Sequence, residues 1–132
     1  MRVALSLVLL CSLRLGASAS DACPITLIGG SGDPHRITIT FKNNAQLPIR
    51  QLDFTCKAID TEADKASRWH CYESDASFAP GVEQTVSYSL SGRIPGPVLV
   101  SVKSVTFSDG TTWKPSRHSS CPVLKIRLPL SN

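Results

Sequence analysis

The chain has 132 residues, of which 42% are hydrophobic and 18% charged, and its formal net charge is +4 at pH 7. This length suits one domain and is marginal for two. The basic residues are scattered rather than clustered, which argues against a nucleic-acid partner. After the leader described next, no stretch is long and apolar enough to cross a bilayer.

Residues 1–19 have the layout of a secretory signal peptide. Arg2 gives a basic start, an apolar run extends from Val3 to Leu13, and the small-residue pattern Ala17-Ser18-Ala19 follows. We expect cleavage after Ala19 and a secreted or periplasmic protein. Removing Arg2 and Arg14 from the 14 basic residues leaves 12 against 10 acidic residues, so the exported chain carries about +2.

The segment that follows contains the glycine-rich stretch GGSGDPH, Gly29 to His35. It has no alternation of apolar and polar residues, and we interpret it as a linker. The expected organisation is therefore a signal peptide at 1–19, an N-terminal segment at 20–34 tied down by a disulfide, and a β-sandwich domain at 35–132.

Short segments with a period of two predict strands along the rest of the chain. The first has Ile37, Ile39 and Phe41 on one face, and the second has Leu52, Phe54, Cys56 and Ala58 on one face. The apolar register changes between Val102 and Val105, which predicts a β-bulge near Lys103-Ser104. The expected strands lie at 35–43, 48–60, 68–74, 82–90, 98–107 and 123–128.

These strands are separated by clusters of Gly, Pro, Asn and Asp, and no stretch has a helical period. That pattern is typical of an all-β, antiparallel two-sheet sandwich of the immunoglobulin-like kind with about seven strands.

Four of the five cysteines lie after the leader, an even number in a chain routed to an oxidising compartment. Two disulfides can form in three connectivities. The positions favour Cys56 with Cys71, at the facing ends of two strands, and Cys23 with Cys121, near the two termini. No Cys-x-x-Cys pair is present, so these cysteines do not indicate a zinc site.

The runs ITITFKNNAQLPIRQLDFTC, PGVEQTVSY and VLVSVKSVTFSDGTTWKP resemble small exported bacterial domains of immunoglobulin-like or fibronectin-like shape. The similarity covers roughly Ile37 to Pro115. That family is largely uncharacterised, so the resemblance implies export and a β-sandwich and transfers no catalytic residue.

The stretch TFSDGTTW predicts a hairpin whose tip is Asp109-Gly110, a dipeptide suited to a type I′ turn. Trp113 follows the tip and precedes Lys114. It either caps the sheet or stands exposed as an aromatic binding anchor, so Asp109, Gly110, Trp113 and Lys114 form a candidate binding site. Trp69, two residues before Cys71 and so close to a predicted disulfide, is expected in the core.

Catalytic chemistry is not indicated. There is no Gly-x-Ser-x-Gly motif, and Ser31, Asp33 and His35 are spaced along one loop in a way that does not favour a triad. His35, His70 and His118 are the candidate metal ligands, although each falls where an exposed polar residue is expected. We predict no enzyme activity, no cofactor and no metal site.

The sequence therefore favours an exported, non-catalytic β-sandwich that contacts an unknown protein or cell-envelope partner through loops or an edge strand. One alternative is an inhibitor of an exogenous hydrolase, acting through a loop such as IGGSGDPH or SGRIPGP. Another is a metal-binding periplasmic protein that uses the three histidines.

Overall fold

A computed structural model describes residues 22–59, 66–73, 76–89 and 96–129, and within strand β4 it describes side chains at Cys71 and Glu73. The signal-peptide prediction lies outside the described residues. Eight strands and no helix occur in this part of the chain: β1 Ile25–Asp33, β2 Arg36–Asn43, β3 Ile49–Ile59, β4 Ala66–Glu73, β5 Glu83–Ser89, β6 Val98–Phe107, β7 Thr112–Trp113 and β8 Leu124–Ile126. None of the described residues forms a helix able to span a membrane.

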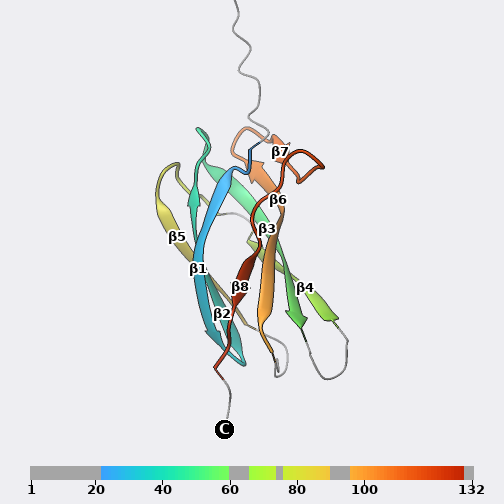
Figure 1. Ribbon diagram of the computed structural model, residues 1–132. Helices are drawn as coiled ribbons and strands as arrows, with labels where there is room; N and C mark the ends of the chain where they lie inside the picture. Colours follow the sequence, from blue (N-terminus) through green and yellow to red (C-terminus); the bar gives the residue numbers. More distant parts are fainter. Residues whose placement is uncertain (1–21, 60–65, 74–75, 90–95, 130–132) are drawn as a thin grey trace, which may run out of the picture.

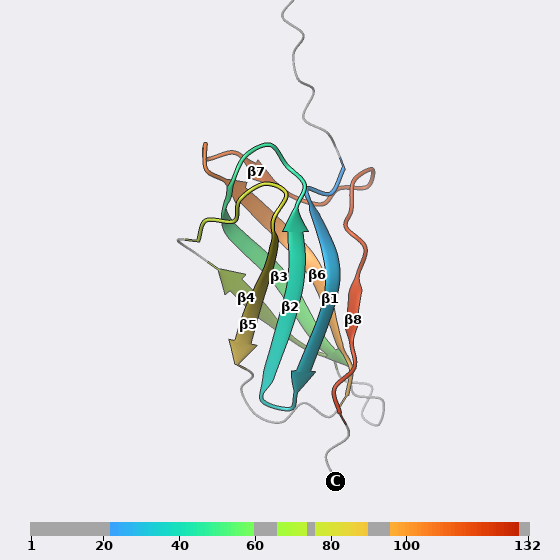
Figure 2. The same cartoon turned by 90° about the vertical axis from the view of Figure 1, so that its left-hand side faces the viewer.

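The strands form two antiparallel sheets packed face to face (Figures 1 and 2). The smaller sheet has the order β1-β2-β5. The larger has the order β4-β3-β6-β7, with β8 also paired to β6. The predicted fold class, an all-β, antiparallel two-sheet immunoglobulin-like sandwich, is confirmed.

The core forms where the apolar residues of the alternating strands meet between the sheets. Phe41 on β2, Phe54 on β3 and Phe78 before β5 meet edge to face, with ring centroids 6.1 Å apart for Phe41 and Phe54 and 5.0 Å for Phe41 and Phe78. The other buried apolar residues are Ile25, Ile37, Ile39, Ile49, Leu52, Cys56, Ala58, Cys71, Val86, Val98, Val100, Val102, Val105 and Ile126.

The predicted bulge in β6 is present. Asp53 pairs with Ser104 and the next residue of β3, Phe54, pairs with Val102, so Lys103 is the extra residue. It lets both Val102 and Val105 face the core despite their odd spacing.

The linker interpretation of the glycine-rich segment is wrong. Residues Ile25–Asp33 form β1, which pairs along its length with β2. Its glycines permit a close approach of the C-terminal segment: a Cβ on Gly30 would lie 2.6 Å from the Ile126 side chain, and one on Gly32 would lie 3.0 Å from Leu128 and 2.6 Å from a backbone oxygen. Gly30 and Gly32 therefore belong to the seam where β1 meets the C-terminal segment.

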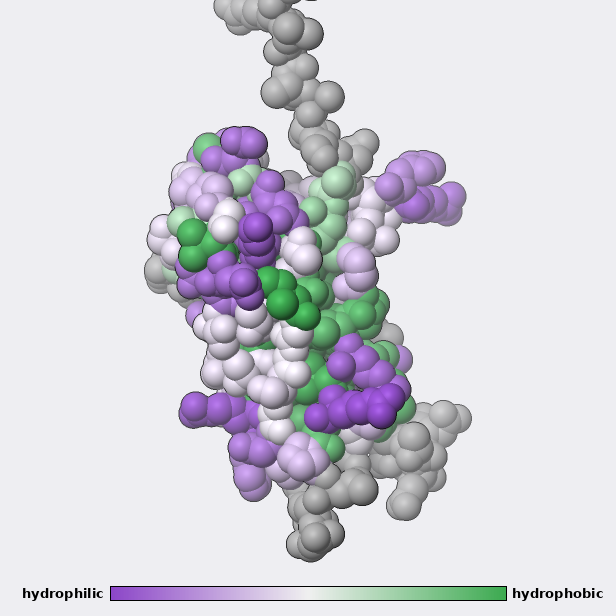
Figure 3. All heavy atoms as spheres, turned by 60° about the vertical axis from the view of Figure 1, so that its left-hand side comes forward, coloured by the Kyte–Doolittle hydropathy of each residue, from purple (hydrophilic) through white to green (hydrophobic). Residues whose placement is uncertain are grey.

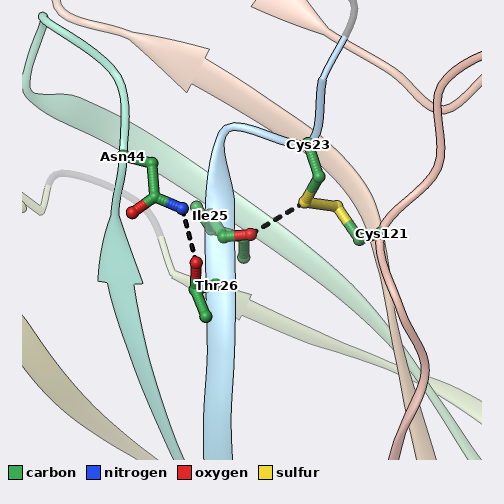
Figure 4. The surroundings of a disulfide bond; sticks show 5 residues. All are labelled: Cys23, Ile25, Thr26, Asn44 and Cys121. Atoms are coloured by element: carbon green, nitrogen blue, oxygen red, sulfur yellow. Dashed lines mark hydrogen bonds between the residues drawn. A yellow bond between two sulfur atoms is a disulfide. The ribbon is translucent and has the colours of Figure 1, made fainter.

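Both disulfides are those that the sequence predicted, Cys23–Cys121 and Cys56–Cys71. Cys56 pairs in register with Trp69, and Cys71 with Phe54, so this bridge joins diagonal neighbours on the inner face of β3 and β4. Cys23 stands just before β1 and is linked to the segment preceding β8 (Figure 4). Its sulfur lies 2.9 Å from the Ile25 carbonyl oxygen, a close contact without a proton because a disulfide sulfur carries none.

Asn43 ends β2 and is fully buried, although the sequence marks it as a turn residue. Its Nδ2 donates to the carbonyl oxygens of Leu47 (2.9 Å) and Phe78 (3.0 Å), and its Oδ1 accepts from the Ala45 amide (2.9 Å). One side chain thus holds the β2–β3 connection against the segment that leads into β5.

Replacing Asn43 with Leu should destabilise the fold by about 2–4 kcal/mol, because it removes the donor to the Leu47 and Phe78 carbonyl oxygens and the acceptor of the Ala45 amide, and the Phe78 oxygen keeps only its bond from the Ile49 amide. The matched control is Asn44→Leu at the exposed neighbouring position. Urea unfolding followed by circular dichroism measures both variants. Equal midpoints for the two would contradict the bracing role of Asn43.

Candidate functional site: the tip of the β6–β7 hairpin

The hairpin tip has a three-residue loop, Ser108 to Gly110. The Gly110 amide donates to the Phe107 carbonyl oxygen (3.0 Å), and the Phe107 amide donates to the Thr111 carbonyl oxygen (2.9 Å). This pattern is a four-residue turn from Phe107 to Gly110, whose last residue, Gly110, has φ 86°. The predicted two-residue type I′ turn is therefore wrong: Ser108 belongs to the loop, and Gly110 is the last residue of the turn instead of lying at its centre.

Asp109 shapes the tip with its own side chain. Its Oδ1 accepts from the Thr111 hydroxyl (2.6 Å) and from the Thr111 amide (2.9 Å). The hydroxyl bond and then the amide bond hold the pKa of this fully exposed carboxyl below its ordinary value. The Ser108 amide also donates to the Pro48 carbonyl oxygen (2.9 Å), which ties the tip to the β2–β3 connection.

Gly110→Val should destabilise the fold by roughly 1–3 kcal/mol, because a β-branched residue resists positive φ. No atom lies within 4 Å of the place a Cβ would take, so the cost is conformational rather than steric. Gly110→Asn is the matched variant, since Asn tolerates this region and should cost clearly less. Thermal melting of both variants tests this, and equal losses would show that backbone conformation is not the cause.

Trp113 is half-buried and packs against the hydrophobic core. Of the two arrangements that the sequence left open, a cap on the sheet and an exposed binding anchor, this is the cap. Its strand partner is Val105. The neighbouring hydroxyls of Thr106 and Thr112 lie 3.2 Å apart across the same ladder. The surface of the tip is therefore formed by Asp109, Gly110 and Lys114, all exposed, above a tryptophan that attaches it to the sandwich.

The candidate metal ligands are not brought together. His35 lies in the β1–β2 turn and His118 in the β7–β8 connection, and Figures 1 and 2 show these segments at opposite ends of the sandwich. His70 lies in β4, where its backbone pairs with Thr55. In the described ranges, no three His, Cys, Asp or Glu residues are grouped closely enough to hold a metal ion.

The Ser31, Asp33 and His35 set is also accounted for by local structure. Asp33 Oδ1 accepts from the backbone amides of His35 (2.7 Å) and Arg36 (2.9 Å), so its carboxylate caps the tight turn between β1 and β2. The stretch IGGSGDPH is thus paired strand and turn instead of a protruding inhibitory loop. Most of the other candidate inhibitor loop, SGRIPGP, lies outside the described residues, and so does the Trp69 side chain.

Tyr88 is a titratable side chain that sequence reasoning did not single out. It points inward from β5, and its hydroxyl is buried with no hydrogen-bond partner among the described residues. Burial, followed by the carboxylates of Glu73 and Asp53, raises the pKa of this phenol far above its ordinary value. These three side chains come together only because β5 packs against the larger sheet. No local sequence pattern could therefore have shown the altered pKa of Tyr88.

Tyr88→Phe should leave stability unchanged or raise it by about 1 kcal/mol, because it removes a buried hydroxyl that has no partner while keeping the ring. Tyr88→Ala, which also removes the ring, should destabilise by several kcal/mol. Chemical denaturation of the pair separates the two contributions. A large loss in Tyr88→Phe would mean that the hydroxyl is bonded in solution.

No family model matches this chain, and no curated protein sequence matches it. Among solved structures it is similar to the seventh ScaB type I cohesin from Pseudobacteroides cellulosolvens, a crystal structure. The two share 13% sequence identity, the match covers 82% of this chain and 94% of the cohesin, and the TM-score is 0.37. A likeness at this level identifies neither a shared family nor a shared partner.

Proposed function

We propose that this chain is an exported, non-catalytic β-sandwich protein that acts by non-covalent contact with a protein or another component of the cell envelope. Export is supported by the N-terminal leader pattern and by two disulfides, which form and persist in oxidising compartments. The sandwich supplies a rigid scaffold for the contact.

The observation that carries the proposal is the tip of the β6–β7 hairpin, which is both exposed and held in one conformation. The Asp109 carboxylate, the turn and the Ser108 bond to Pro48 all restrict it. A loop already ordered in the free protein loses little conformational entropy on binding, so its contacts convert more fully into affinity. Asp109 and Lys114 then offer one charge of each sign to a partner.

A photo-crosslinking amino acid at Thr111, in the full chain made by an exporting cell, tests the proposal. The control places it at Ser31, an exposed position on β1. We expect a discrete crosslinked species from Thr111 that is absent from Ser31 and is lost when Lys114 is changed to Glu. Identical products from the two positions would refute the tip as the contact site.

A further inference from the structure

A row of side chains crosses the outer face of the larger sheet. Lys57 on β3 pairs in register with Leu99 on β6, and Leu99 pairs with Lys125 on β8. Directly paired residues of an antiparallel ladder point to the same side of the sheet. The residues that flank the row in sequence and face the core are Cys56, Ala58, Val98, Val100 and Ile126, so the row itself faces outward.

The row places two ammonium groups on one flat surface with a leucine between them. Neighbouring strands lie about 4.8 Å apart, so the backbones of Lys57 and Lys125 are about 10 Å apart. Neither lysine forms an ion pair within the part of the chain that the structure describes. Arg127, two residues after Lys125, is also exposed.

Among the described residues, the neighbours of this row are neutral or paired with the opposite charge. Thr55 and Ser101, paired with each other, form the next row and add two hydroxyls. Asp53, further along β3, lies 3.8 Å from the Lys103 ammonium. The strand partner that the two lysines share is Leu99, which carries no charge, so an anion that binds across the row gains two charge-assisted contacts.

The outer face of the smaller sheet provides a contrast. Figure 3 views that side of the molecule, and pale residues of intermediate hydropathy cross its middle. They include hydroxyl pairs 3.1 Å apart, Thr38 with Ser87 and Thr40 with Thr85. Its cations have acidic neighbours in register, since Arg36 pairs with Asp33 and Lys42 with Glu83. In the part of the chain that the structure describes, the cations of the smaller sheet thus have acidic partners in register, whereas Lys57 and Lys125 on the larger sheet have none.

We propose that the cationic face, defined as Lys57, Leu99, Lys125, Thr55 and Ser101, binds an acidic polysaccharide that carries carboxylate groups. The two ammonium groups pair with carboxylates, and the Thr55 and Ser101 hydroxyls exchange hydrogen bonds with sugar hydroxyls. Leu99 packs under the C–H face of a sugar ring. This site is separate from the hairpin tip and does not depend on it.

The chemistry of the face favours this occupant over other anions. Recognition of an anionic membrane uses clusters of four to eight basic residues close together. Of the large apolar side chains that are most exposed in the described residues, Ile28, Leu47 and Val82 lie on other segments, and Val123, two residues before Lys125, is a single apolar side chain at the border of this face. An acidic peptide adds to a sheet edge through its backbone, whereas this row lies on the face of the sheet.

The test measures binding of the disulfide-intact mature protein to polygalacturonate, with neutral dextran and poly-glutamate as comparison polymers, by isothermal titration calorimetry. The variant is Lys57→Glu/Lys125→Glu. Its matched control is Arg36→Glu/Lys42→Glu, which changes the net charge equally on the other sheet. Lys57→Gln/Lys125→Gln removes the charges with little change in size, and melting curves verify that each variant is folded.

We expect polygalacturonate to bind and dextran not to, with affinity falling about tenfold or more in both Lys57/Lys125 variants and less than about threefold in the control. Affinity should also fall as salt is raised. Equal losses in the control, equal binding of poly-glutamate, or no binding by the wild type would each overturn the inference. A persistent Thr111 crosslink alongside such a failure would leave the proposed function standing, because the two experiments address different surfaces.

Discussion

Phe41→Ala is expected to destabilise the protein by about 3–5 kcal/mol, a large share of the roughly 5–15 kcal/mol that stabilises a small domain. Phe41 is fully buried and makes edge-to-face contacts with Phe54 on the opposite sheet and Phe78 on the segment leading into β5. Truncation to alanine removes buried apolar surface and both aromatic contacts, and it leaves a cavity between the two sheets.

Lys42→Ala is the control for this variant, because Lys42 is the next residue of β2 and is exposed. Surface changes of that kind stay within about 0.5 kcal/mol. Urea denaturation followed by tryptophan fluorescence and circular dichroism gives both values. If Phe41→Ala lost no more than Lys42→Ala, the packing of the two sheets through this ring would be refuted.

Removal of the terminal disulfide by Cys23→Ala/Cys121→Ala should cost about 4 kcal/mol, within the 2–5 kcal/mol typical of small secreted domains. The two cysteines are 98 residues apart, so their bridge restricts most of the unfolded chain. In the folded protein it also holds the start of β1 beside the segment that leads into β8 (Figure 4).

Melting curves of this double variant and of Ser120→Ala, at the exposed neighbour of Cys121, measure the effect. The wild-type protein unfolded with and without a reductant provides an independent comparison. An unchanged melting temperature in the double variant would mean that the bridge does not restrict the unfolded state.

Much of the fold was predictable because it follows from local alternation. In a half-buried strand every second side chain faces the core, so Leu52, Phe54 and Cys56 are identified by spacing alone. The same rule located the bulge at Lys103, where the apolar register changes by one residue. The cysteine positions were informative because strand ends and chain ends restrict which pairs can meet.

Other elements lacked such a pattern. Strand β1 was missed because Gly29, Gly30 and Gly32 carry no side chain and so show no alternation. The hairpin type was predicted wrongly because an Asp-Gly pair serves both a two-residue turn and the last two positions of a three-residue loop. Asn43 carries an ordinary turn signal, yet its burial depends on two segments that pack over it.

The candidate sites divide in the same way. Asp109, Gly110 and Lys114 are neighbours in sequence, so their joint presentation at one tip was evident from a short stretch of chain. The cationic face joins Lys57, Leu99 and Lys125 from three strands, and the Tyr88 environment joins residues of β3, β4 and β5. The sequence by itself determined which residues face inward, because alternation is local. Only the tertiary structure decided which outward residues become neighbours, because register between distant strands is set by the packing of the whole sandwich.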